Sequence, residues 1–124
     1  MKRRVFLVAA AVMLAGCGSS TAPSNDTNDG SAFDITIGTG TRPTYTWPGG
    51  LGFSVSVVRV SAPGTIVWGI ANPAQTIASP VTHGTVPGGS IASANTEPTL
   101  TAGVKYRVAI TRADTKTGFK EFTP

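Results

Sequence analysis

The feature of this sequence that most constrains its fold is a two-residue alternation of apolar and polar side chains in short stretches. One such stretch runs from Lys105 to Arg112 (KYRVAITR), where the apolar Tyr106, Val108 and Ile110 alternate with residues of the other face that include Lys105, Arg107 and Thr111. Successive side chains of a β-strand point to opposite faces, so this alternation predicts a half-buried strand. Phe53 to Val60 (FSVSVVRV) also alternates, but the apolar phase shifts at Val57-Val58. We expect a bulge at that point, or burial of both faces.

Shorter stretches of the same kind are separated by Gly- and Pro-rich segments, which predict turns. The remaining expected strands are Phe33–Ile37, Thr44–Trp47, Thr65–Ala71, Ile77–Thr82, Ser90–Ala94, Pro98–Leu100 and Phe119–Phe122. We expect turns at Ala62–Gly64 and Asp114–Gly118, and we expect Ile66, Trp68 and Ile70 to share one face of their strand. No stretch beyond the first residues has helical periodicity. The sequence therefore predicts an all-β fold, a small sandwich of about seven short strands.

The first residues have the pattern of a secretion signal. A cationic start, Lys2 to Arg4, precedes an uncharged apolar run from Val5 to Ala15. That run is too short to span a bilayer core, which requires about 20 residues as a helix, but it suits the apolar region of a signal. The run leads into Leu14, Ala15, Gly16 and Cys17, a tetrapeptide that resembles the lipobox of bacterial lipoproteins.

The lipobox resemblance implies cleavage before Cys17, a diacylglycerol thioether on that cysteine and usually an N-acyl lipid on the new amino terminus. Two or three acyl chains hold a protein firmly on a membrane, whereas one chain does not. Cys17 is the only cysteine, so the lipidated protein would contain no disulfide. Gly18 follows it instead of the Asp that retains some lipoproteins in the inner membrane. The resemblance therefore implies a cell-envelope protein in the outer membrane, with no cofactor besides the covalent lipid.

Residues 18–32 (GSSTAPSNDTNDGSA) are small and polar, without apolar periodicity. Such a segment cannot bury enough apolar surface to fold, so we expect a flexible tether. We divide the chain into a signal peptide at 1–16, a lipidated cysteine with its tether at 17–32, and a β-sandwich domain at 33–124. The signal contains three of the ten Lys and Arg residues, which leaves seven against six acidic residues. Nucleic acid is therefore not an expected partner.

A second resemblance concerns the fold. Leu100–Val108 (LTAGVKYRV) resembles the corner between strands E and F of fibronectin type III and other immunoglobulin-like domains, where a tyrosine opens strand F. It implies that the hydroxyl of Tyr106 bonds back to upstream backbone. Trp47 and the stretch Phe53–Val60 then match the strand B tryptophan and strand C. The stretch from Asn72 to Glu97 departs from the family's pattern, which leaves another small sandwich as the alternative.

No catalytic or metal-binding pattern emerges from the sequence. His83 is the only histidine and lies in a Pro- and Gly-rich stretch without a G-x-S-x-G motif, so we expect a loop or strand-end residue. One histidine without a free cysteine does not make a zinc site. Asn25–Gly30 lacks the ligands of a calcium loop at two required positions, and we assign it to the tether. The four carboxylates of the expected domain show no pairing; they are Asp34, Glu97, Asp114 and Glu121.

The aromatic residues are the remaining candidates for binding. We expect Trp47 in the core, whereas an exposed Tyr45 or Trp68 could contact a sugar or a protein partner. Lys105, Arg107 and Arg112 lie on the polar face of one strand, which predicts a solvated surface. The sequence thus favours a non-enzymatic envelope lipoprotein whose sandwich binds or positions a partner, an envelope protein or a glycan. The alternative function is a carbohydrate-binding module.

Overall fold

The computed structural model describes residues 30–124, which form eight antiparallel β-strands and no helix. One sheet has three strands in the order β1-β2-β5, and the other has five in the order β6-β4-β3-β7-β8. The strands are β1 (Thr36–Ile37), β2 (Thr44–Thr46), β3 (Gly52–Arg59), β4 (Ala62–Ala71), β5 (Val81–Thr82), β6 (Ile91–Asn95), β7 (Tyr106–Arg112) and β8 (Thr117–Phe122). In this part of the chain no helix is long and apolar enough to cross a bilayer.

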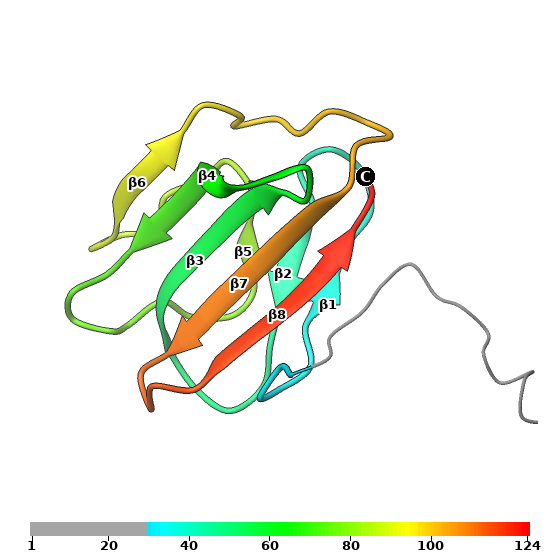
Figure 1. The fold of residues 1–124 in the computed structure, drawn as a ribbon. Helices are drawn as coiled ribbons and strands as arrows, with labels where there is room; N and C mark the ends of the chain where they lie inside the picture. Colours follow the sequence, from blue (N-terminus) through cyan, green and yellow to red (C-terminus); the bar gives the residue numbers. More distant parts are fainter. Residues whose placement is uncertain (1–29) are drawn as a thin grey trace, which may run out of the picture.

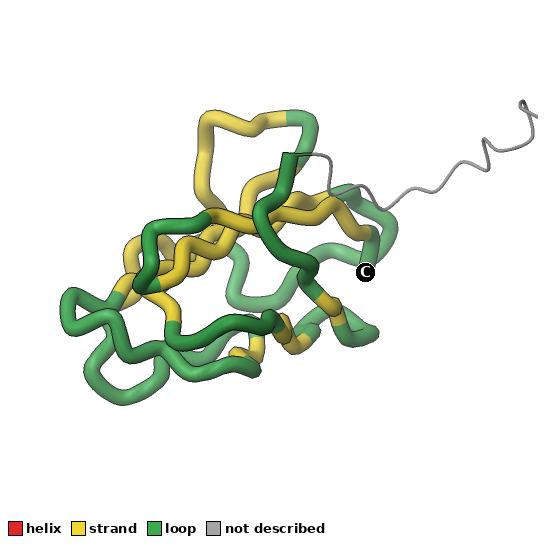
Figure 2. Tube along the Cα trace, turned by 90° about the horizontal axis from the view of Figure 1, so that it is seen from below, coloured by secondary structure: helices red, strands yellow, loops and turns green. Residues whose placement is uncertain are grey.

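The two sheets face each other as the layers of a sandwich. The five-stranded sheet faces the viewer in Figure 1, with β1, β2 and β5 behind it, and the layers are separate in Figure 2. The core between the layers contains Ile35, Tyr45, Trp47, Val55, Val57, Val67, Trp68, Ile70, Ile77, Val81, Leu100, Tyr106, Val108, Ile110 and Phe122. This architecture confirms the prediction of a small all-β sandwich.

The alternation in β3 and β7 determines which of their residues enter the core. Val55 pairs with Ile110 and Val57 with Val108 across these neighbouring strands. All four side chains are fully buried, while the residues between them face outward. Burying a valine or isoleucine contributes about 1.5–3 kcal/mol, so this pair of central strands stabilises the whole domain.

A bulge in β4 reverses the expected direction of one apolar side chain. Val57 pairs with Trp68 and Val58 with Ile66, which leaves Val67 as the extra residue. The predicted irregularity at Val57-Val58 is therefore confirmed, but the extra residue lies in the partner strand. The prediction that Ile66 shares a face with Trp68 is wrong, because the bulge changes the alternation between them. Ile66 is 43% exposed, and Trp68 is buried.

A second bulge lies in β3, opposite β7. Gly52 pairs with Arg112 and Ser54 with Thr111, so Phe53 is an extra residue between the two pairs. Simple alternation would place Phe53 in the core with Val55. The bulge turns it outward instead, and its side chain is 39% exposed.

Several predicted boundaries differ from the structure. The expected turn at Ala62–Gly64 begins β4, and the chain reverses at Val60-Ser61 instead. Pro98–Leu100 is not a strand, and only the last two residues of Phe33–Ile37 and of Ile77–Thr82 are in strands. Pro80 and Pro98 lack the amide hydrogen that the ladder of a strand requires, whereas Pro63 lies within β4 despite this lack.

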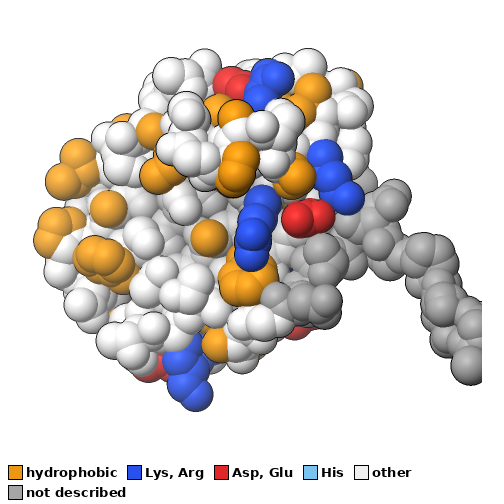
Figure 3. Space-filling model, in the orientation of Figure 1, with side chains coloured by type: hydrophobic (Ala, Val, Ile, Leu, Met, Phe, Trp, Pro, Cys, Tyr) orange, Lys and Arg blue, Asp and Glu red, His pale blue; other side chains and the backbone are white. Residues whose placement is uncertain are grey.

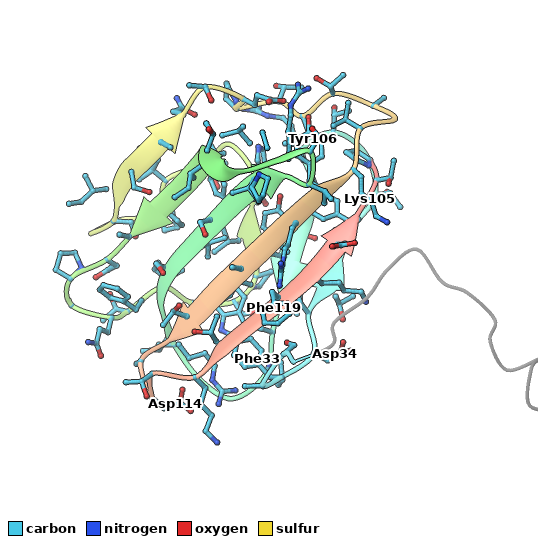
Figure 4. The ribbon with its side chains drawn as sticks, in the orientation of Figure 1. Phe33, Asp34, Lys105, Tyr106, Asp114 and Phe119 are labelled. Atoms are coloured by element: carbon cyan, nitrogen blue, oxygen red, sulfur yellow. The ribbon has the colours of Figure 1, made fainter. Side chains whose placement is uncertain are left out.

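The residues next to Phe33 cover the outer edge of β8. The Ala32 amide donates a 3.0 Å hydrogen bond to the Thr117 carbonyl. The Phe119 amide donates a 2.9 Å bond to the Ser31 hydroxyl. Figure 4 shows Phe33 beside β8, on the same side of the molecule as Phe119. These contacts place residues 30–32, which we expected in the tether, against the domain.

Candidate functional site

A buried polar network surrounds His83, which directly follows β5. Its Nε2 lies 2.7 Å from the carbonyl oxygen of Glu97, and its Nδ1 lies 2.8 Å from the hydroxyl of Tyr45. A carbonyl only accepts hydrogen bonds, so we assign the proton to Nε2. Nδ1 then accepts from the Tyr45 hydroxyl. A neutral imidazole can therefore form both hydrogen bonds, donating one from Nε2 and accepting one at Nδ1.

Burial keeps the central groups of this network neutral. Desolvation lowers the pKa of His83, and the nearby Arg42 charge lowers it further, although the bond to the Glu97 carbonyl opposes the shift. Desolvation raises the pKa of Tyr45 well above its ordinary value. The indole of Trp68 packs against His83 with 4.4 Å between ring centroids. His83 is thus a fully buried core residue with both nitrogens bonded, which supports a structural role.

The carboxylate of Glu97 extends the network toward the surface. Its Oε2 accepts a 2.7 Å hydrogen bond from Arg59, and its Oε1 accepts a 2.7 Å bond from the Tyr106 hydroxyl. The bond from Arg59 is the main reason that the pKa of Glu97 is lowered. The Tyr106 hydroxyl also accepts a 2.8 Å bond from the Thr101 amide. This upstream backbone contact is the one that the resemblance implies for Tyr106.

Replacing Tyr106 by Phe removes the hydroxyl that joins Thr101 and Glu97. We expect a loss of about 1–3 kcal/mol in the free energy of unfolding, because the Thr101 amide and the carboxylate each lose a partner. Urea unfolding measures the change. Thr111→Val is the control, because it removes a hydroxyl of the same strand whose bond, to the Thr117 hydroxyl, lies at the surface, and it should change stability by less than about 0.5 kcal/mol. Equal losses in both variants would contradict a specific role for the Tyr106 hydroxyl.

Two further ion pairs and a cation–π contact lie apart from this network. Arg112 pairs with Asp114 at 2.6 Å, and Lys105 pairs with Glu121 at 3.4 Å. Arg107 lies over the ring of Phe119, 4.2 Å from its centroid. Across residues 30–124, no group of three or more His, Cys, Asp or Glu residues could hold a metal ion.

The structure corrects one of the predicted binding sites. Trp68 is 1% exposed and Tyr45 is 0% exposed. A stacking platform needs an accessible ring face, so neither ring serves as one in this structure. Trp47 lies in the core, as expected. The lipobox residues Leu14, Ala15 and Gly16, with the lipidation site Cys17, lie outside the described residues, and their roles stay predictions.

Three of the six large apolar residues that are exposed in residues 30–124 lie on a surface that we did not predict. It is the outer face of β6, β4 and the adjoining half of β3, and we call it the β6 face. Its large apolar residues are Phe53, Ile66 and Ile91, the last of which is 60% exposed. The smaller residues of the β6 face are Ser54, Ser56, Gly69, Ala71, Ser93 and Ala94. The two bulges expose Phe53 and Ile66, so alternation alone does not find this surface.

The β6 face is free of charge. No Asp, Glu, Lys or Arg occurs between Arg59 and Glu97, a segment that includes all of β4, β5 and β6. Figure 3 shows hydrophobic side chains at the left of the visible face, where β6 and β4 lie in Figure 1. The charged side chains lie along the top, the bottom and the opposite side of that face. This gap in the charge pattern is the sequence signal that could have located the surface.

The face ends at a free strand edge. β6 is the outermost strand of its sheet, and four of its five residues are exposed. Among the described residues no strand pairs with its outer side. An open edge of this kind is a template for pairing with another strand.

Comparisons with family models, with curated proteins and with solved structures find no match to this chain.

Proposed function

We propose that this protein is a lipid-anchored lipoprotein of the cell envelope, whose non-catalytic sandwich binds or positions a partner through the β6 face. The observation that carries the binding role is the β6 face itself, where three exposed apolar residues border an uncharged surface and an open strand edge. Contiguous exposed apolar patches on small domains mark interaction sites. The hydrogen bonds that occupy His83 and Glu97 support a non-catalytic role, because both groups are used in holding the fold together.

The lipobox supports the anchor and the envelope location. Cys17 would be acylated, and residues 18–29 would separate the domain from the lipid headgroups. Gly18 favours the outer membrane. The described chain starts beside β8, at the opposite edge of the sheet from β6. An anchor attached on that side would leave the β6 face accessible to a partner.

We also propose that the sandwich is of the fibronectin type III-like kind. The order β1-β2-β5 matches strands A-B-E of that family, and β4-β3-β7-β8 matches C′-C-F-G. The bond between the Tyr106 hydroxyl and the Thr101 amide supports the corner assignment. β6 is then an additional strand at the C′ edge. The fold itself implies no chemistry, so the function depends on the surface that this extra strand provides.

Replacing Cys17 by Ala tests the anchor. The wild-type chain, expressed at full length, should incorporate radiolabelled palmitate and sediment with membranes, because the lipidated cysteine holds it there. Cys17→Ala should lose essentially all of the label and the membrane association. Ser19→Ala, two residues away, is the matched control and should behave as wild type. A wild-type chain that takes up no label would contradict the proposed anchor, and density fractionation of the labelled membranes would identify the membrane.

A further inference from the structure

We propose that the β6 edge pairs with the β6 edge of a second copy of this chain, which joins two sandwiches through one continuous sheet. The proposal rests on the proposed function in taking the β6 face as the binding surface, and it names the partner as this protein itself. The pairing would be antiparallel and symmetric, with the centre of β6 on the two-fold axis.

The two edges of the five-stranded sheet differ in how they are covered. Residues 31–33 lie along β8, where the Ala32 amide and the Ser31 hydroxyl form hydrogen bonds with that strand. No described segment covers β6 in this way. Proteins protect open edges with charged side chains, prolines, bulges or covering loops. β6 has the sequence IASAN, which contains neither a charge nor a proline, and its one irregularity is a bulge at Ser93 in the pairing with β4.

The charge pattern favours a second copy over a different partner. In a symmetric contact each residue near the axis meets the same residue of the other copy, so any charge there would meet a like charge. The absence of Asp, Glu, Lys and Arg between Arg59 and Glu97 removes this repulsion along the whole edge. A partner recognised by charge would have no complementary group to meet on this surface.

The residues of β6 suit this arrangement. Ser93 is the central residue of the strand and would lie nearest to its counterpart in the other copy. Gly69 has no side chain, which leaves room for the Ser93 hydroxyl over β4; a Cβ at Gly69 would lie only 2.8 Å from that oxygen. Ile91 is the most exposed apolar residue of the domain described here, and the pairing would cover it from the neighbouring copy.

The size of the edge indicates that membrane confinement is needed. A pair of five-residue strands buries less than the roughly 1,200 Å² of a standard stable interface. Tethering raises the effective concentration of two binding partners and so compensates for a small contact. Both described ends of the chain lie away from β6. Residues 31–33 follow β8, and the Pro124 carbonyl accepts a hydrogen bond from Gly103, so neither end obstructs the pairing.

Crosslinking in intact cells tests the pairing on the full-length chain. Ser93→Cys places a thiol at the proposed axis, and a short bis-maleimide should join two copies through it. Ala102→Cys is the matched control, an exposed position in the turn before β7. We expect the crosslinked dimer fraction of Ser93→Cys to exceed that of the control by about tenfold. Equal fractions, or adducts only with other proteins, would overturn the proposal.

A second measurement does not depend on cysteine chemistry. Two copies with different fluorescent tags after Pro124 should show energy transfer in intact cells, where both stay on the membrane, and Ser93→Lys should reduce this several-fold because two lysines would face each other. Unchanged energy transfer would contradict the β6 contact. Palmitate labelling of the same cells separates the two proposals. A labelled chain without Ser93 crosslinks would overturn the pairing alone, whereas an unlabelled chain that crosslinks would overturn the anchor alone.

Discussion

Replacing Trp68 by Ala is expected to lower the free energy of unfolding by about 3–5 kcal/mol, the usual cost of removing a large buried aromatic side chain. The indole is 1% exposed and packs against Tyr45 and His83. A domain of this size is stable by about 5–15 kcal/mol in total, so the variant should be largely unfolded under mild denaturing conditions. Urea unfolding of the full chain, followed by circular dichroism, measures the loss.

Ile66→Ala is the matched control, because Ile66 lies in the same strand two residues before Trp68. The bulge at Val67 places its side chain on the outer face, 43% exposed. Truncating it should cost less than about 1 kcal/mol, since little apolar area leaves the core. Equal losses of stability in the two variants would show that Ile66 is buried, as simple alternation predicts. They would contradict the bulge at Val67.

The central strands could be predicted from the sequence because their pattern is local. Alternation along β3 and β7 identifies Val55, Val57, Val108 and Ile110 as core residues, and the structure confirms all four. Each of these side chains is directed inward by the two-residue period of its own strand. The turns that precede both strands contain glycines with positive φ, Gly49 and Gly50 before β3 and Gly103 before β7.

The exposed surface could not be predicted in the same way, because bulges depend on the partner strand. Phe53 and Ile66 have the periodicity of core residues, and each is turned outward by one residue that the neighbouring strand does not match. The burial of Trp68 depends on β6, which makes β4 an inner strand of the sheet. No local pattern in β4 shows that a distant five-residue segment pairs with it.

The polar network around His83 could not be predicted from the sequence either, because its residues come from separate segments of the chain. His83 and Glu97 flank β6 in the chain, while Tyr45 and Tyr106 come from strands of different sheets. Only the contact of Tyr106 with upstream backbone is short in sequence, and it follows from the corner motif. The remaining bonds link the loop before β7 to both sheets, which ties the connection around β6 to the core.

Lowering the pH from 7.5 to 5.5 is expected to destabilise the folded protein through His83. Desolvation lowers the pKa of this imidazole below the ordinary histidine value of about 6.5. Below that value the unfolded chain binds a proton that the folded chain does not bind. The contribution of the neutral His83 to the free energy of unfolding is therefore fully present above pH about 6.5, and it decreases as the pH falls toward the folded-state pKa. Urea midpoints of the full chain at several pH values measure the decrease.

The assignment of this acid effect is direct because His83 is the only histidine in the chain. The groups that face it are the Tyr45 hydroxyl, the Trp68 indole and the Glu97 carbonyl, none of which titrates between pH 5.5 and 7.5, and the charges of Arg42 and of the Glu97 carboxylate also act on it. The pKa values of Glu97 and Asp114 are both lowered from values already below 5, so their contributions are lost only at more acidic pH.

His83→Gln separates the proton effect from the loss of packing. The variant should be less stable at pH 7.5 by about 1–3 kcal/mol, because a buried ring and at least one hydrogen bond are lost. Its urea midpoint should nevertheless stay constant between pH 7.5 and 5.5, since the amide does not titrate. A variant that keeps the wild-type pH dependence would show that another group binds the proton. A wild-type urea midpoint that does not fall would show that the imidazole is protonated within the folded protein, where the Tyr45 hydroxyl and the Glu97 carbonyl would both accept hydrogen bonds from it.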